Sequence, residues 1–251
     1  MFSARLLLAA AVLVATACDR PAHGQPADST ETSKPQDNPH AALGQPLVDQ
    51  PENLKRLDPA RPLWIDLKNR RVVMIGQVCQ REAMLEMFAC LRDTKEHESV
   101  LSVDVEAFKV HAGLLAVGAQ VGHPVKFDPV YAPAAGTEIE IALVYKDEKD
   151  RRRKARAQDW IHDAATGKAM AHPFVFAGSG FWKDEQTGKR QYFAEGGDFI
   201  CVSNFSSAML DVPIQSSQGN DQLMFRAFTK RIPPLGTPVT MILTPKLEEK
   251  G

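Results

Sequence analysis

The sequence predicts an α+β fold with a mainly antiparallel sheet and one main buried helix at about residues 104–120. Short segments of alternating apolar residues, separated by turn signals, fill most of the chain beyond residue 60, and such segments are typical of strands. Only residues 104–120 show helical spacing. Strands and helices do not alternate regularly, which argues against a doubly wound parallel sheet.

The expected strands follow one another along the chain. Residues 63–67 and 72–79 flank a Lys-Asn-Arg turn and predict a hairpin. Alternation is sharpest in EIEIALVY, residues 138–145. The full set of expected strands is 63–67, 72–79, 85–91, 99–103, 138–145, 154–161, 174–182, 190–194, 199–205, 223–229 and 237–243.

One apolar stripe marks the expected helix. Its members recur at helical spacing and are Val105, Phe108, Ala112, Leu115 and Ala119. Asp104 is the expected N-cap, because its side chain can accept a hydrogen bond from the first turn. Val110, Leu114 and Val117 lie off the stripe, so we expect the helix to be covered on more than one side.

The first eighteen residues, MFSARLLLAAAVLVATAC, predict export. A positive charge at Arg5 precedes an apolar run over residues 6–14, which is too short for a membrane span of about 20 residues. We expect residues 1–17 to be a signal peptide and Cys18 to carry lipid, which would anchor the chain durably to a membrane. Ala15 stands where a lipoprotein signal usually has Leu, so cleavage by ordinary signal peptidase, leaving a free thiol, is the alternative.

Composition divides the rest of the chain near residue 60. Residues 18–60 are dense in Pro, Asp, Gln, Ser and Thr and contain no aromatic residue, so they lack the apolar surface that would offset the entropy of ordering. We expect a lipid-anchored, disordered, Pro-rich tether there, followed by a single folded domain over residues 61–247.

The charge balance excludes one class of partner. The formal net charge is -1 at pH 7, which gives no general attraction to nucleic acid. The basic run KDRRRKAR, residues 149–156, has acidic neighbours and indicates a solvated turn, with a patch for an anionic ligand as the alternative. We therefore expect the membrane, through the lipid on Cys18, and an unknown protein or small molecule as partners, and no nucleic acid.

Four motifs together resemble those of the YdjY-like domain family. They are the run from Cys79 to Ser102, HAGLLAVGA (111–119), FVFAGSGF (174–181) and GDFICVSNF (197–205), and the resemblance covers about residues 63–245. It implies an exported bacterial protein, often a lipoprotein, of no established activity. The family is described as ferredoxin-like, and as a fold this agrees with the α+β prediction.

The cysteines of the folded part argue against an iron–sulfur cluster, which generally needs four cysteine ligands in tight spacings. Only Cys79, Cys90 and Cys201 are available, and none forms a CxxC pair. Cys79 and Cys90 lie on consecutive expected strands, where facing residues can form a disulfide in an oxidising compartment. Two reduced core thiols and a redox-active pair are the alternatives, and Cys201 is expected to be an inert buried thiol.

One polar cluster could carry chemistry. Its candidate residues are Glu96, His97, Glu98, Ser99 and His111. On a strand, His97 and Ser99 would share one face, and the helix could bring His111 back toward them. Two imidazoles with a carboxylate would suit zinc, or one imidazole could act as a general base. The alternative is that both histidines satisfy buried polar partners.

Three functions from different classes remain open. The first is a membrane-tethered, exported lipoprotein with a single binding or interaction domain, no catalysis and no cofactor, which we favour because HExxH, GxSxG, P-loop and dinucleotide motifs are all missing from the sequence. The second is a metal-dependent or acid–base enzyme centred on His97 and His111. The third is a thiol redox partner that uses Cys79 and Cys90.

Overall fold

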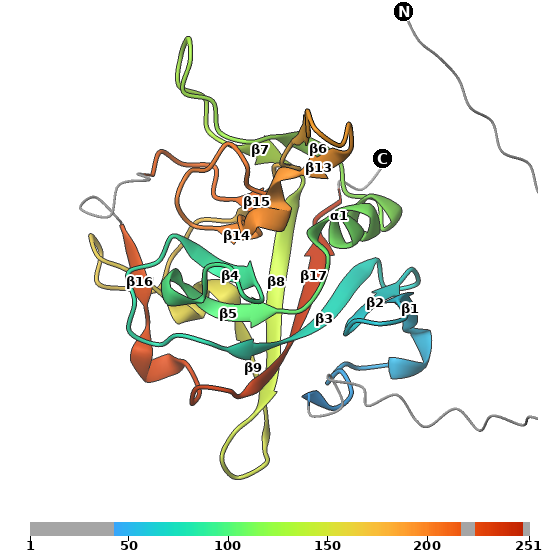
Figure 1. Ribbon diagram of the computed structural model, residues 1–251. Coiled ribbons are helices and arrows are strands. Elements are labelled where there is room, and N and C mark those ends of the chain that lie inside the picture. Colours follow the sequence, from blue (N-terminus) through green and yellow to red (C-terminus); the bar gives the residue numbers. More distant parts are fainter. Residues whose placement is uncertain (1–42, 217–223, 248–251) are drawn as a thin grey trace, which may run out of the picture. The chain divides into compact units, whose positions relative to one another are not determined.

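Strands dominate the part of the chain that the computed structural model describes, residues 43–216 and 224–247 (Figure 1). In chain order the elements are η2 (Pro51–Asn53), β1 (Lys55–Asp58), β2 (Leu63–Asp66), β3 (Arg71–Val78), β4 (Met87–Leu91), η3 (Glu96–Glu98), β5 (Ser99–Val103), α1 (Ala107–Ala116), β6 (Val121–His123), β7 (Ala135–Gly136), β8 (Glu138–Lys146), β9 (Arg152–Arg156), η4 (Ala157–Trp160), β10 (Ile161–Asp163), β11 (Phe174–Phe176), β12 (Phe181–Lys183), β13 (Arg190–Tyr192), η5 (Phe193–Gly196), β14 (Ile200–Cys201), β15 (Leu210–Asp211), β16 (Phe225–Ala227), η7 (Thr229–Arg231) and β17 (Pro238–Pro245).

Eight of these strands close into a barrel. Their order is β3-β17-β8-β11-β15-β14-β4-β5, and β5 pairs with β3 again to complete the ring. All pairs are antiparallel except β14 with β15 and β4 with β5. Strands hold 38% of the residues and helical turns 14%, so the fold is mostly β and the predicted α+β class is wrong. Pairing between β3 and β5 joins segments over twenty residues apart, and local periodicity carries no signal for it.

Residues 72–79 and 85–91, which are consecutive expected strands, do not pair with each other. β5 lies between β3 and β4, antiparallel to the first and parallel to the second. Gly76 lets β3 approach β5, because a Cβ atom at this position would lie only 2.6 Å from the carbonyl oxygen of Ser102. The backbone of β3 therefore closes the barrel at a residue without a side chain.

The α-helix is shorter than predicted and turns a different face to the core. α1 begins after Glu106, not after Asp104, which instead pairs with Arg61. Phe108 and Leu115, both in the predicted stripe, are 50% and 45% exposed. The buried side consists of the residues Ala107, Val110, Gly113 and Leu114.

Close approach of the helix to the sheet explains which face is buried. A Cβ atom on Gly113 would lie 2.8 Å from a Leu57 methyl group and 3.0 Å from one of Val72, so the helix backbone rests directly on β1 and β3. The helix contacts the sheet along the face that contains Gly113, because only a residue without a side chain fits there. The larger apolar residues of the predicted stripe lie on another face of the helix.

The ordered structure starts before residue 61. Leu43 and Val48 are buried in a second apolar cluster with Trp64, Val73 and Ile75, on the side of β3 opposite to the main core. Because successive residues of a strand face opposite sides, Val72 and Met74 join the main core instead. Leu43, Val48 and Leu54 thus cover the outer face of β3, whereas Leu57 packs against the main core. Residues 1–42 of the predicted signal and tether lie outside the described residues.

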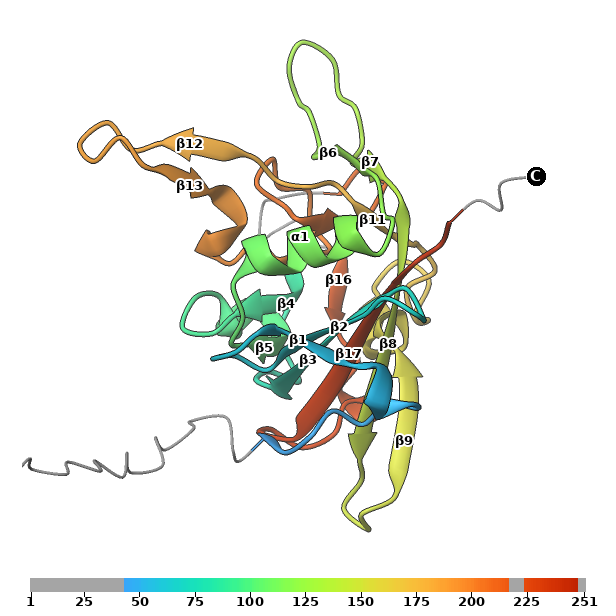
Figure 2. The ribbon, with the colours of Figure 1, turned by 90° about the vertical axis from the view of Figure 1, so that its right-hand side faces the viewer.

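Three small two-stranded sheets stand beside the barrel: β6 with β7, β10 with β16, and β12 with β13. The β12–β13 hairpin extends sideways beyond the N-terminal end of α1 (Figure 2). Within the residues described, no helix has the length and apolar character that a membrane crossing requires.

Candidate functional site

The predicted polar segment forms a helical turn rather than a strand. Residues 96–98 make up η3, and Ser99 opens β5 with its hydroxyl donating to the carbonyl oxygen of Lys95 at 2.8 Å. The His97 side chain is 77% exposed, and its Nε2 lies 3.6 Å from a carboxylate oxygen of Glu98. Glu96 accepts a hydrogen bond from the amide of Asp93 and so caps the preceding turn.

His111 belongs to a different neighbourhood. Its Nδ1 lies 2.9 Å from the Tyr192 hydroxyl, which donates to the carbonyl oxygen of Gly178 at 3.1 Å. Its ring also packs edge-on against Phe176, with ring centroids 4.8 Å apart. Burial lowers the pKa of His111 and so favours its neutral form. Because the Tyr192 hydroxyl donates to Gly178, the arrangement is satisfied by the tautomer in which Nδ1 carries the proton.

The two histidines share no partner. His97 contacts Glu98, whereas His111 contacts Tyr192 and Phe176. Across the described ranges, no group of three or more His, Cys, Asp or Glu side chains is arranged to hold a metal ion. The expected convergence of His97 and His111 with a carboxylate is therefore not found in the structure.

The predicted disulfide is also not present, because Cys79 and Cys90 are free thiols. They do not face each other across a hairpin: Cys79 follows β3, Cys90 lies in β4, and β5 runs between these strands. The nearby Cys90 thiol and burial both raise the pKa of Cys79, and the Cys79 thiol donates a hydrogen bond to the carbonyl oxygen of Ser99 at 3.1 Å. The third cysteine of the domain, Cys201, is fully buried as expected, and burial raises the pKa of its thiol.

A charged cluster that the sequence did not reveal lies beside η3. The Lys95 ammonium group sits 2.8 Å from Asp198 and 3.7 Å from Glu98, above the ring of Phe205. Burial and the neighbouring Glu98 carboxylate raise the pKa of Glu86. Of this cluster, only Glu98 was among the predicted site residues. Glu86, Lys95 and Glu98 lie close together in the sequence, but Asp198 comes from a distant segment, so the sequence does not show that it joins them.

Next to this cluster lies a buried carboxyl group. Asp211 in β15 has no exposed surface, and burial raises its pKa well above the usual range. One of its oxygens, Oδ2, and the hydroxyl of Ser203 have no hydrogen-bond partner among the described residues. Tyr131, from the loop between β6 and β7, donates to Asn204 at 3.1 Å and so closes this region from the outside.

The basic run at residues 149–156 is partly neutralised within the domain. Arg152 and Lys154 pair with Asp49 at 2.8 and 3.1 Å, and Arg151 and Arg153 pair with Asp147 at 2.9 and 2.8 Å. Because four cations share two carboxylates, these pairs reduce the positive charge of the run without cancelling it. The pairs to Asp49 also attach the N-terminal segment to β9.

Exposed aromatic side chains gather where α1 meets the β12–β13 hairpin. We call Phe108 and Phe181 the aromatic surface, and they are 50% and 42% exposed. Trp182 is 45% exposed, but it follows Phe181 in β12 and therefore faces the other side of the hairpin. The rings of Phe108 and Phe181 meet edge-on with centroids 6.2 Å apart, and both contact the buried ring of Tyr192.

Two contacts hold the aromatic surface in place. Glu195 of η5 accepts a hydrogen bond from the amide of Phe108 at 2.9 Å and so caps the N-terminus of α1 from outside the helix. The His111–Tyr192 hydrogen bond joins the same helix to β13. His111 therefore links α1 to β13 beneath the aromatic surface. These contacts fit the alternative in which the histidine satisfies a buried polar partner.

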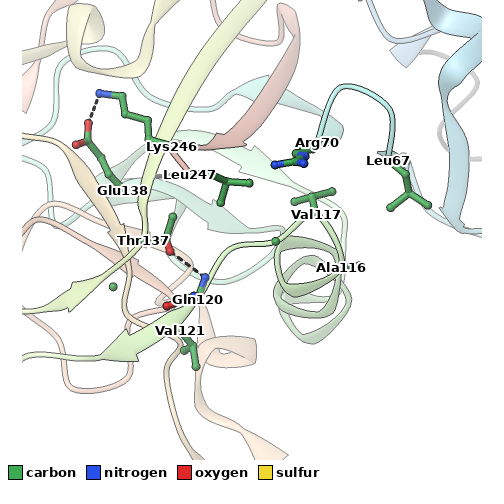
Figure 3. Close-up of a pocket in the computed structure, with 12 residues that line it drawn as sticks. Leu67, Arg70, Ala116, Val117, Gln120, Val121, Thr137, Glu138, Lys246 and Leu247 are labelled. Atoms are coloured by element: carbon green, nitrogen blue, oxygen red, sulfur yellow. Dashed lines mark hydrogen bonds and ion pairs between the residues drawn. The ribbon is translucent and has the colours of Figure 1, made fainter. Parts of the chain in front are cut away.

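A cleft of about 1330 Å³ lies on another side of α1 (Figure 3). The turn between β2 and β3 forms one wall, the C-terminal end of α1 the second, and the start of β8 with the end of β17 the third. Charged residues line it together with apolar ones, among them Arg70, Lys246, Leu67, Val121 and Leu247.

Comparison with known proteins yields one match. The family model described as YdjY domain matches residues 63–244, which is more than half of the chain. No curated protein and no solved structure matches the chain.

Proposed function

The chain belongs to the YdjY domain family, and on that premise we propose that it is an exported lipoprotein whose domain binds a protein partner through the aromatic surface. The lipid would be attached to Cys18, after removal of residues 1–17. The family match supports the domain assignment, and the export signal in the sequence supports the location.

The aromatic surface is the observation that carries this proposal. Soluble domains seldom expose large aromatic rings packed against each other, as Phe108 and Phe181 are here, and aromatic residues with arginine are enriched at the centres of protein interfaces. Here Arg190 stacks over Phe181 with its guanidinium carbon 4.5 Å from the ring centroid. Because α1, η5 and β13 are tied together by Glu195 and His111, the surface is preorganised and little entropy would be lost on binding.

A protein fits this surface better than a lipid bilayer does. The tip of the β12–β13 hairpin, residues 184–188, reads Asp-Glu-Gln-Thr-Gly and is polar and acidic. Phe181 lies at the base of the hairpin, beside α1, where the tip would keep it from the acyl region of a membrane. A polar rim around an aromatic centre is the arrangement found in protein interfaces.

Site-specific photo-crosslinking in cells would test the surface. A photoreactive amino acid replacing Phe108 or Phe181 should give a discrete protein adduct. The same substitution at Leu235, which is 62% exposed but lies in another loop, serves as the control. Adding excess purified wild-type domain should reduce the amount of adduct, because it occupies the partner. Adding the same amount of a purified Phe108→Ser variant should leave the adduct unchanged. Equal labelling at all three positions, or adducts with lipid alone, would contradict the proposal.

Mass spectrometry of the mature N-terminus would test the anchor. We expect the first residue to be Cys18 with acyl chains attached, and Cys18→Ser to move the protein out of the membrane fraction. An unmodified Cys18, or cleavage at another bond, would refute lipidation without affecting the test of the aromatic surface.

A further inference from the structure

Arg70 presents an unpaired positive charge to the cleft. It ends the turn between β2 and β3, and its side chain points from that turn toward Leu247 (Figure 3). Among the described residues it has neither a hydrogen bond nor an ion pair, whereas the second cation of the cleft, Lys246, is paired with Glu138. Of the charged groups that line the cleft, Arg70 is therefore the one without a partner of opposite charge among the described residues.

The backbone at Arg70 is held in a conformation that suits other residues better. Its φ is 50°, in the left-handed region, where this kind of hairpin turn normally has Gly or Asn. A longer side chain is disfavoured there. The side chain at this position thus has a role that the turn itself does not explain, and the cleft supplies a place for it.

Apolar side chains stand around the charge. Leu67 and Val121 are 54% and 47% exposed, on opposite walls of the cleft. Val117 and Leu247 lie between them and extend the apolar lining from the end of α1 to the end of β17. Ligand sites typically combine such an apolar lining with a few polar groups that fix orientation.

We propose that the cleft binds an amphiphilic anion. A carboxylate or phosphate group pairs with Arg70, whose planar guanidinium can donate two parallel hydrogen bonds to such a group. The apolar chain of the ligand covers Leu67, Val121 and Leu247. This site lies on a different side of α1 from the aromatic surface and does not depend on the protein partner.

Calorimetric titration with dodecanoate, below its micelle concentration, would test the site. The full chain with Cys18→Ser avoids detergent, which would compete for the cleft. We expect saturable binding with one ligand per chain. Acetate should bind at least 100-fold more weakly because it lacks the apolar chain, and dodecanol at least tenfold more weakly because it lacks the charge.

Substitutions would locate the ligand. Arg70→Asn removes the charge and keeps a residue that accepts the left-handed backbone, so it should weaken dodecanoate binding at least tenfold in a folded protein. Leu67→Ser should weaken it several-fold, since this exposed side chain contributes apolar contact only. Lys68→Gln, in the same turn but outside the cleft lining, should leave binding unchanged.

Each alternative result is decisive. Absence of saturable dodecanoate binding, or unchanged affinity in Arg70→Asn, overturns the proposal. Equal binding of acetate would show a site for a free anion only, and equal binding of dodecanol would show a merely apolar groove, and either result rejects the amphiphilic ligand.

Discussion

Replacing Gly76 by alanine should destabilise the domain, because this glycine is where the barrel closes. Gly76 of β3 pairs with Val239 of β17 on one side and with Val103 of β5 on the other. A Cβ atom there would lie 2.6 Å from the Ser102 carbonyl oxygen and 2.7 Å from a Val103 methyl carbon, while ordinary contact begins at 3.4 Å. Because the first of these neighbours is backbone, a rotamer change cannot relieve the clash, and β3 and β5 must separate.

The magnitude follows from two contributions. Overpacking typically costs about 1–3 kcal/mol, and a weakened hydrogen bond in the β3–β5 ladder adds about 1 kcal/mol. We expect the free energy of unfolding to fall by about 3 kcal/mol, which changes the unfolding equilibrium on the order of 100-fold. Amides of β5 should also exchange with solvent faster than in the wild type.

Urea unfolding followed by tryptophan fluorescence would measure this loss, since Trp160 is 1% exposed in the folded domain. Gly196→Ala is the matched control, because Gly196 is exposed and no atom lies within 4 Å of its added Cβ. It should change stability by no more than about 0.5 kcal/mol. If Gly76→Ala were as stable as this control, barrel closure through β3 and β5 would be refuted.

Three further substitutions test other contacts. Tyr192→Phe should cost about 1–3 kcal/mol, because His111 Nδ1 and the Gly178 carbonyl lose their shared partner, and unchanged stability in urea would contradict that link. Leu114→Ala should lower the free energy of unfolding by about 2–5 kcal/mol and Leu115→Ala by less than about 1 kcal/mol, since the first side chain is fully buried and the second is 45% exposed. A larger loss in Leu115→Ala would mean that the helix buries the face predicted from the sequence. Burial and Glu98 raise the pKa of Glu86, so the protonated carboxyl contributes stability below its unfolded pKa of about 4.3, and this contribution is lost as the pH rises through the folded-state pKa. Glu86→Gln should therefore become progressively more stable than the wild type as the pH is raised from about 4 to about 8, and a constant difference over that range would reject the assignment.

The family and most strand positions were accessible from the sequence. The family match over residues 63–244 agrees with the resemblance carried by the four motifs. EIEIALVY was predicted as a strand at residues 138–145 and forms β8, Glu138–Lys146, because alternation of apolar and polar residues is a local property that survives in the fold. The existence of one helix was likewise predicted correctly, although its bounds and its buried face were not.

The buried face of that helix could not be read from its own residues. Phe108 and Leu115 are the larger apolar residues, and a periodicity argument turns them inward. In the structure, Gly113 sets the contact with β1 and β3, and the aromatic residues of the hairpin receive Phe108 at the surface. Which stripe is buried depends on the partner surface, which a single segment does not contain.

The candidate sites likewise depended on contacts that a single segment does not reveal. Sequence proximity of Glu96, His97 and Glu98 suggested a joint site, but η3 turns His97 to solvent while Glu98 joins Lys95. The unpaired charge of Arg70 and the aromatic surface were invisible, because the first depends on what is absent around a side chain and the second on rings from residues 108 and 181 meeting in space.

The sequence by itself determined the positions of most strands and the family, because both depend on patterns within short segments. The tertiary structure alone decided the fold class and the sites. A strand carries the same alternation in an open sheet and in a closed barrel, and only the pairing of β3 with β5, made possible at Gly76, separates the two. That pairing places β5 between β3 and β4, so Cys79 and Cys90 do not face each other across a hairpin. The packing of α1 on β1 and β3 leaves both the aromatic surface and the cleft of Arg70 exposed.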